Sequence, residues 1–265
     1  MTDYKLICKE IEKIVRETGK YILRESSIFD KSKAKTKGIN DFVSYVDKSS
    51  EEMLVDKLGS VLPEAGFITE EGTSSKAGPE YCWVIDPLDG TTNFLHGLHP
   101  FAISVGLTRK NDPVAGVVYE TGGYEMFSAW KDGGAWLNGH SIHVSGISSL
   151  SGSLIATGFP YSDFKRMTGY MECFSHFCEI TQGIRRLGSA AIDMAYVACG
   201  RFEGFYEYSL HPWDITAGTI LVREAGGIVS DFAGNEKNMT GNEIIAANNL
   251  VYKEFLENVS KFMNF

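Results

Sequence analysis

The chain has few cysteines, and their positions do not suggest pairing. Its 265 residues include five cysteines, an odd number, at the irregular positions 8, 82, 173, 178 and 199. Cys173 and Cys178 lack a second pair that could complete a zinc site. We therefore expect reduced thiols packed in the interior of a cytoplasmic protein, whose fold needs no disulfide or structural zinc.

Long apolar runs and an excess of positive charge are also missing. No window reaches the ~18 apolar residues of a membrane-spanning helix, and residues 1–5 do not begin a secretory signal. Lys and Arg number 25 against 34 Asp and Glu, which gives a formal charge of −9. Nucleic-acid surfaces need clustered positive charge, so we expect a small-molecule partner, with no nucleic acid and no membrane.

Four common catalytic motifs are absent as well. The sequence contains no GxxxxGK, GxGxxG, GxSxG or HExxH, which removes the usual parts of P-loop, dinucleotide, serine-hydrolase and zinc-protease sites. A content of 43% hydrophobic and 22% charged residues is typical of a globular chain with a large core. Carboxylate chemistry remains as the best-supported alternative.

Hydrophobic periodicity divides the chain into two halves, 1–148 and 149–265. Residues 3–25 have helical spacing, 31–37 (KSKAKTK) form a basic stretch typical of a solvated loop, and 41–47 alternate like a strand. Residues 49–62 predict a helix, with Ser49 and Glu52 at capping-box spacing. Short runs within 67–144 predict a largely antiparallel sheet. Beyond about residue 150, strands and helices alternate.

Two carboxylates stand close together in Asp86-Pro87-Leu88-Asp89-Gly90, directly after the apolar run 82–85. Proline and glycine here predict a tight turn just past a strand. The carboxylates would repel each other unless a cation such as Mg²⁺ lay between them, and Leu88 could add its carbonyl oxygen. The alternative is an ordinary Asp-Gly turn.

Further acids follow a short strand and begin a helix. Glu70 and Glu71 end the run 67–69, and Asp214 begins a helix just after a His-Pro break. Each has a plain alternative: the glutamates could be solvated, and Asp214 could be an acidic first-turn residue. Together they offer oxygen ligands on strand ends and helix starts, a common setting for metal-dependent phosphoester chemistry.

These segments resemble the inositol monophosphatase family. The matching motifs are WVIDPLDGTTNF at 83–94, with Glu70-Glu71 before it, and HPWDITAG at 211–218, followed by EAGG at 224–227; LGSAAIDM at 187–194 and IIAANN at 244–249 extend the similarity over nearly the whole chain. The resemblance implies an α/β (α+β) fold, a five-layer αβαβα sandwich. It also implies a lithium-sensitive homodimer, and we expect the metal site to lie where the two halves meet.

The resemblance assigns metal ligands to five residues. Glu70, Asp86 and the Leu88 carbonyl would hold one Mg²⁺, and Asp86, Asp89 and Asp214 would hold a second. A third, weaker ion would lie near Glu70. Two-metal sites activate a water and stabilise the departing alkoxide, so no covalent phosphoenzyme is needed.

Catalytic roles are implied for Glu70, Thr91 and Asp47. Thr91 would hydrogen-bond the attacking water, and Asp47 would orient Thr91. From its position alone, Asp47 is better interpreted as the N-cap of the helix at 49–62, and the two roles can coexist.

Substrate recognition is implied for residues on both sides of the metals. Glu207 lies seven residues before Asp214, the spacing of the family's inositol-hydroxyl acceptor, although it could be a surface acid. Asp193 stands where some relatives have Asn. The implied substrate residues are Asp89, Gly90, Thr91, Gly188, Ser189, Ala190, Glu207 and Asp214.

The favoured reaction is Mg²⁺-dependent hydrolysis of a polyol or sugar phosphate, with myo-inositol monophosphate first. Alternative substrates are fructose 1,6-bisphosphate, histidinol phosphate and 3′-phosphoadenosine 5′-phosphate, the last disfavoured by Thr92-Asn93. An aspartyl-phosphate mechanism would need DxDx[TV], whereas two residues separate Asp86 from Asp89. A metal-dependent regulatory protein without catalysis is the non-enzymatic alternative.

Overall fold

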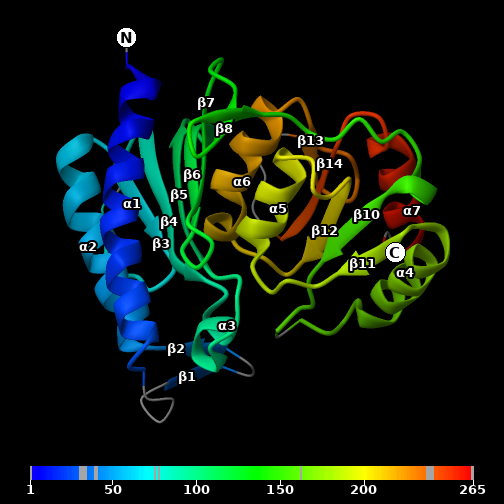
Figure 1. The fold of residues 1–265 in the computed structure, drawn as a ribbon, viewed down its shortest axis with the longest axis horizontal. Helices are drawn as coiled ribbons and strands as arrows, with labels where there is room; N and C mark the ends of the chain where they lie inside the picture. The colour runs from blue at the N-terminus through cyan, green and yellow to red at the C-terminus, as the bar shows by residue number, and fades with distance from the viewer. Residues whose placement is uncertain are drawn as a thin grey trace.

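A computed structural model of the protein describes residues 2–29, 35–38, 41–74, 76, 78–161, 163–236 and 242–263. These residues form five layers that alternate helices with sheets (Figure 1). The predicted αβαβα sandwich is confirmed. Among the described residues, no helix has the length and apolar character needed to cross a bilayer.

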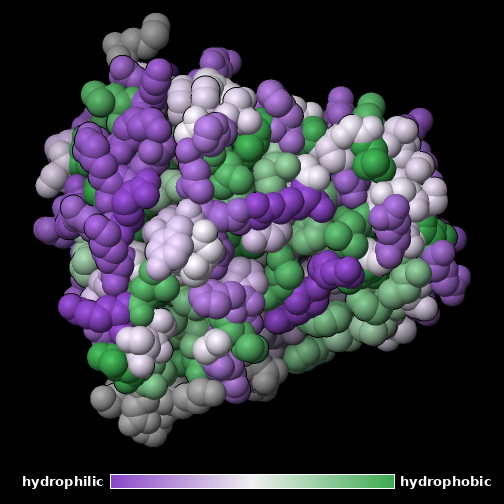
Figure 2. Space-filling model, viewed as in Figure 1, coloured by the Kyte–Doolittle hydropathy of each residue, from purple (hydrophilic) through white to green (hydrophobic). Residues whose placement is uncertain are grey.

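The first layer is a helix pair, α1 (Tyr4–Ser26) and α2 (Tyr45–Val61). Asp3 caps α1 by accepting the N–H of Leu6 at 3.0 Å. Ile7, Ile11 and Ile22 lie on its buried face, as the helical spacing predicts. Hydrophilic side chains cover much of the molecule's surface on the α1 side (Figure 2), which leaves the apolar face for the sheet.

The second layer is a seven-stranded sheet whose strands follow chain order. Only β3 and β4 pair in parallel, so the prediction of a largely antiparallel sheet is confirmed. The strands are β3 (Gly66–Thr69), β4 (Tyr81–Asp89), β5 (Ala102–Arg109), β6 (Asp112–Glu120), β7 (Glu125–Trp130), β8 (Ala135–Leu137) and β9 (His140–Ile142).

Helices α5 (Ala190–Ala198) and α6 (Pro212–Glu224) form the middle layer. Two glycines let α6 approach the large sheet closely. A Cβ on Gly106 would lie 2.4 Å from Thr216 Cγ2, and one on Gly116 would lie 2.6 Å from Ile220 Cγ2. This close approach brings the first turn of α6, with Asp214, toward the strand β4.

The last two layers are a five-stranded sheet and two helices, α4 (Met167–Ile180) and α7 (Tyr252–Met263). Along β12, Phe205 packs into the middle layer while Tyr206 packs toward α4 and α7, the alternation expected of a strand covered on both faces. The sheet order is β11 (Gly183–Arg185), β10 (Leu154–Thr157), β12 (Gly204–Tyr208), β14 (Glu243–Ala247) and β13 (Ile228–Ser230).

Two local predictions are wrong. The segment 41–47 is not one strand: β2 (Asp41–Val43) is short, and α2 begins at Tyr45 with Ser44 as its N-cap. The basic stretch was expected to be a loop, yet its residues 35–37 belong to β1 (Lys35–Gly38), which pairs with β2; residues 31–34 lie outside the described residues. The division into halves at residue 148 stays a prediction.

Candidate active site

A bulge near the end of β4 displays the two aspartates predicted to bind metal. Asp86 pairs with Ser104 and Asp89 with Ala102, so β4 has one more residue here than β5. Both aspartates therefore belong to the strand itself, and the prediction of a turn past its end is wrong. Pro87 has no N–H to donate to the ladder, and the Leu88 N–H bonds to Asp86 Oδ1 instead, at 2.9 Å.

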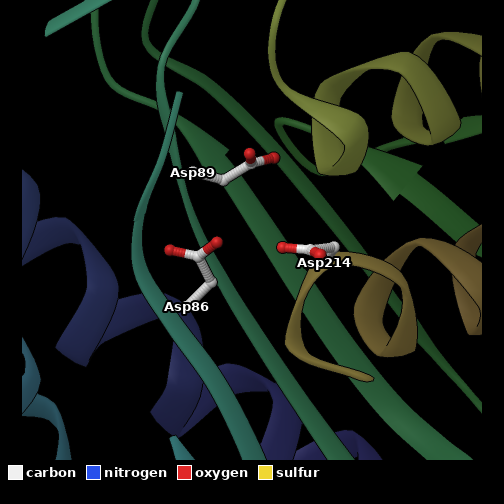
Figure 3. Close-up of side chains that lie close together, drawn as sticks. All are labelled: Asp86, Asp89 and Asp214. Atoms are coloured by element: carbon white, nitrogen blue, oxygen red, sulfur yellow. The ribbon is translucent and has the colours of Figure 1, made fainter. Parts of the chain in front are cut away.

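Asp86, Asp89 and Asp214 converge although Asp214 lies far along the chain. One oxygen from each carboxylate lies within 4.8 Å of the others. Figure 3 shows Asp214 facing the two β4 aspartates across a shared space. The His211 N–H donates to Asp214 Oδ2 at 2.6 Å, and this bond fixes the carboxylate at the first turn of α6.

Burial raises the pKa of each of these aspartates, and the charges of neighbouring acids raise the pKa of Asp86 and Asp214 further. The pKa of Asp86 stands well above its ordinary value because of burial and then the charge of Glu70. Burial raises the pKa of Asp89 to about 6. Burial and then Asp89 raise the pKa of Asp214. A bound cation would relieve this repulsion.

Glu70 reaches the same cluster from β3. Its N–H donates to the Ile85 carbonyl at 3.2 Å, and its side chain lies close enough to Asp86 to raise the pKa of that carboxyl. The cluster thus presents only hard oxygen ligands, from one buried carboxylate, Asp86, and three half-buried ones. This donor set fits a divalent cation such as Mg²⁺ and not a soft metal.

Thr91, the first residue of α3 (Thr91–His96), lies between Asp47 and the Leu88 carbonyl. Its hydroxyl oxygen is 3.1 Å from Asp47 Oδ1 and 3.0 Å from the Leu88 oxygen. Asp47 Oδ2 accepts the N–H of Ser44 at 2.8 Å and its hydroxyl at 2.5 Å. Asp47 is therefore the third residue of α2 in a capping box, and not an N-cap.

The start of α5 lies against Asp89. Ser189 donates its hydroxyl to Asp89 Oδ2 at 2.7 Å, and the Ala191 N–H donates to the same oxygen at 2.8 Å. Gly188 precedes this turn in a left-handed conformation, with φ of +88°. Gly188, Ser189 and Ala190 are therefore placed beside the acidic cluster.

Two further buried acids, Glu207 and Asp193, lie near Asp89. Burial raises the pKa of Glu207 to about 8, while the exposed Arg186 lowers it. Gly158 leaves room for Glu207, since a Cβ there would lie 2.0 Å from Glu207 Oε1. Glu207 is buried, so the surface-acid alternative is wrong. Asp193 is 1% exposed, and neither of its carboxylate oxygens has a hydrogen-bond partner.

Two structural groups were not predicted from the sequence. Asn93 Nδ2 donates to the carbonyls of Pro100 and Leu187, both at 2.8 Å. Glu51, buried in α2, accepts hydrogen bonds from the segment after Glu70. The sequence offers one indication of Glu51, which stands four residues after Asp47 and so shares its face of a helix. For Asn93 it offers no indication beyond the residue's place in the motif at 83–94.

Comparison with known proteins agrees with this geometry. The sequence model of the inositol monophosphatase family matches residues 3–263. The sequence is 42% identical over 245 residues to the Nus factor SuhB of Escherichia coli K12, covering 92% of each chain.

Solved structures give the same result. The extragenic suppressor protein SuhB of Bartonella henselae superposes with a TM-score of 0.89 at 34% identity, covering 96% of this chain and 98% of that one. An IMPase of Thermotoga maritima superposes at 0.86 and 34% identity, covering 95% of both chains. The match extends over nearly the full length of the chain and includes the site motifs. The chain therefore belongs to the inositol monophosphatase family.

Proposed function

We propose that the protein is a Mg²⁺-dependent phosphatase that hydrolyses myo-inositol monophosphate to inositol and phosphate. The observation that carries this proposal is the convergence of Asp86, Asp89 and Asp214 within 4.8 Å. Membership of the inositol monophosphatase family supports it. A homodimeric state and inhibition by lithium are further proposals that rest on the family resemblance alone, whereas a proposed cytoplasmic location rests on the five cysteines, whose number and spacing suggest no pairing.

The acids divide into two overlapping ligand sets. Glu70, Asp86 and the Leu88 carbonyl would hold one ion, and Asp86, Asp89 and Asp214 a second, with a third ion near Glu70. When bound, two to three Mg²⁺ ions supply charge neutralisation at the phosphate, a more acidic water and stabilisation of the leaving alkoxide. The side chains of the protein must orient the attacking water and the substrate.

Thr91 would orient the attacking water. When its hydroxyl hydrogen is donated to Asp47 Oδ1, the lone pairs of Thr91 Oγ1 can accept a hydrogen bond from that water. Because Ser44 holds the other oxygen of Asp47, the acceptor cannot turn away. We assign Glu70, whose side chain lies beside Asp86, to accept the proton that the water loses.

Phosphate and alcohol would be held by different groups. The N–H groups of Gly90 and Thr91 would donate to phosphate oxygens at the start of α3. Glu207 would accept hydrogen bonds from neighbouring hydroxyls of the alcohol. The rest of the substrate wall comprises Asp89, Gly188, Ser189, Ala190 and Asp214.

The test compares phosphate release from four substrates with Mg²⁺: inositol 1-phosphate, fructose 1,6-bisphosphate, histidinol phosphate and 3′-phosphoadenosine 5′-phosphate. We expect inositol 1-phosphate to be preferred, and we expect Glu207→Ala to lose the preference. Glu254→Ala, which changes an exposed acid on α7, is the control. If another ester is preferred, or if Glu207→Ala keeps the preference, the inositol assignment is wrong. If no ester is hydrolysed, the phosphatase proposal fails.

A role as a Nus factor is the second candidate function, and the name of the 42% identical Escherichia coli relative favours it. Such a role would need a macromolecular partner, which the net charge of −9 did not predict. Asp214→Asn should abolish hydrolysis by removing a metal ligand. If this variant still supports growth of cells that lack the native protein, the cellular role does not require hydrolysis.

A further inference from the structure

Helix α2 carries a second buried acid one turn after Asp47. Glu51 is 0% exposed. Residues four apart on a helix share a face, so both acids point from α2 toward the same side. An ionised carboxylate is costly to bury unless it is paired or hydrogen-bonded. The partners of Glu51 therefore indicate what this acid does.

Three donors from the segment after Glu70 surround the Glu51 carboxylate. The Glu71 N–H lies 2.7 Å from Oε2, while the N–H and the hydroxyl of Thr73 each lie 2.8 Å from Oε1. Both carboxylate oxygens are thus used, and hydrogen bonds to a charged acceptor are stronger than neutral ones. Residues 70–74 belong to no helix or strand, so their backbone is not held by the hydrogen bonds of a sheet. The bonds to Glu51 hold this backbone in place instead.

Glu70 is consequently held from both sides. Its own N–H donates to the Ile85 carbonyl at 3.2 Å, and the N–H of the next residue, Glu71, donates to Glu51. Two fixed peptide groups set the direction in which the Glu70 side chain leaves the backbone. That side chain lies beside Asp86 of the acidic cluster.

We propose that Glu51 is a positioning residue for the metal site: it fixes the segment 70–74 and thereby presents the Glu70 carboxylate to a cation at Asp86. The inference rests on the proposed function, because Glu70 is a ligand only if that cluster binds metal. Glu51 itself touches neither metal nor substrate. Its charge is needed because only a carboxylate can accept donors at both oxygens.

The test measures Mg²⁺ binding directly, by isothermal titration of Mg²⁺ into metal-free protein. In Glu51→Gln an amide nitrogen replaces one oxygen and must face an N–H donor, although the volume is unchanged. We expect the Kd for Mg²⁺ to rise about 10- to 100-fold, as for other groups that orient metal ligands. Glu52→Gln, the adjacent exposed acid on α2, is the matched control and should bind like wild type.

Kinetics separate positioning from a general structural role. If Glu51 positions a ligand, excess Mg²⁺ should restore kcat in Glu51→Gln, and KM for the phosphate ester at saturating Mg²⁺ should match wild type. A folded Glu51→Gln protein with wild-type Mg²⁺ affinity would overturn the proposal. So would a loss of activity that excess Mg²⁺ does not restore.

A milder variant keeps the proposal testable if Glu51→Gln does not fold. Thr73→Val removes one hydroxyl donor from an exposed residue and keeps its shape. We expect a smaller rise in the Kd for Mg²⁺, and a wild-type Kd would overturn the proposal. If wild type hydrolyses no ester, the proposed function fails, whereas the Mg²⁺ affinities still decide the role of Glu51.

Discussion

The side-chain amide of Asn93 and the carbonyl of Leu187 lie 2.8 Å apart, which ties α3 to the segment that precedes α5. The same Nδ2 also donates to the Pro100 carbonyl at 2.8 Å. Asn93 is buried, so both carbonyls depend on it in a region shielded from water. Asn93 therefore helps to hold the segment that begins at Gly188 in place relative to α3, together with the bonds of Ser189 and Ala191 to Asp89.

Asn93→Asp should weaken both stability and substrate binding. The change keeps the shape but replaces a donor by an oxygen that faces two carbonyl oxygens. We expect a loss of about 2–4 kcal/mol in the free energy of unfolding, measured with urea, and a higher KM. Asn249→Asp changes an exposed residue and should do neither. Equal stability of the two variants would mean that the bonds of Asn93 contribute little.

Thr91 should affect the rate far more than binding. Thr91→Val keeps the shape and removes the hydroxyl that is proposed to link Asp47 to the attacking water, so we expect kcat to fall about 100-fold with little change in KM. Thr91→Ser keeps the hydroxyl and should retain most of the rate. Steady-state kinetics at saturating Mg²⁺ measure both. A valine variant as active as the serine variant would remove Thr91 from the mechanism.

Most of the fold follows from hydrophobic spacing, and the errors occur where two local signals compete. The stripe of Ile7, Ile11 and Ile22 predicts α1 because a helix buries one face. At the start of α2, Ser44 with Asp47 and Ser49 with Glu52 both have capping-box spacing. The first pair caps the helix, since the additional turn buries Val46 and Asp47. The local sequence does not show which of these two capping boxes starts the helix that buries more apolar surface.

The site was predictable where side chains carry the chemistry. Asp86, Asp89 and Asp214 are recognisable because their motifs record the carboxylates themselves. The roles of Asn93 and Glu51 were not predicted because these side chains bond mainly to backbone groups. Every residue has such groups, so the sequence does not show which of them a side chain will bond. The bulge in β4 was not predicted for a related reason. It arises from the pairing of β4 with β5, which the sequence of β4 alone does not specify.

Metal should reverse the pH dependence of stability. Burial raises the pKa of Asp89 to about 6 and that of Glu207 to about 8 in the metal-free protein. Above pH ~4.5 the unfolded chain has lost protons that the folded state keeps, so stability in EDTA should fall as pH rises toward about 8. Mg²⁺ binds ionised carboxylates of the folded state, so its stabilising effect should grow over the same range.

Thermal unfolding with EDTA or Mg²⁺ at several pH values measures this effect. We expect the gain in Tm from Mg²⁺ to be larger near pH 8 than near pH 5. Asp214→Asn removes a ligand and should lose most of the gain at every pH. A gain in wild type that does not vary with pH would show that the acidic cluster is not the group that Mg²⁺ binds.

Asp193 should lower the stability of the fold. It is 1% exposed, neither carboxylate oxygen has a hydrogen-bond partner, and burial and then the charge of Glu207 raise its pKa well above the ordinary value. The unfolded chain ionises this acid above pH ~4 while the folded state keeps the proton, so stability is lost as pH rises. Asp193→Asn cannot ionise and should add about 1–3 kcal/mol to the free energy of unfolding near pH 8, measured with urea in EDTA. Asp56→Asn, at an exposed position of α2, should add little. A destabilised Asp193→Asn protein would mean that the carboxylate has a partner that stabilises its charge.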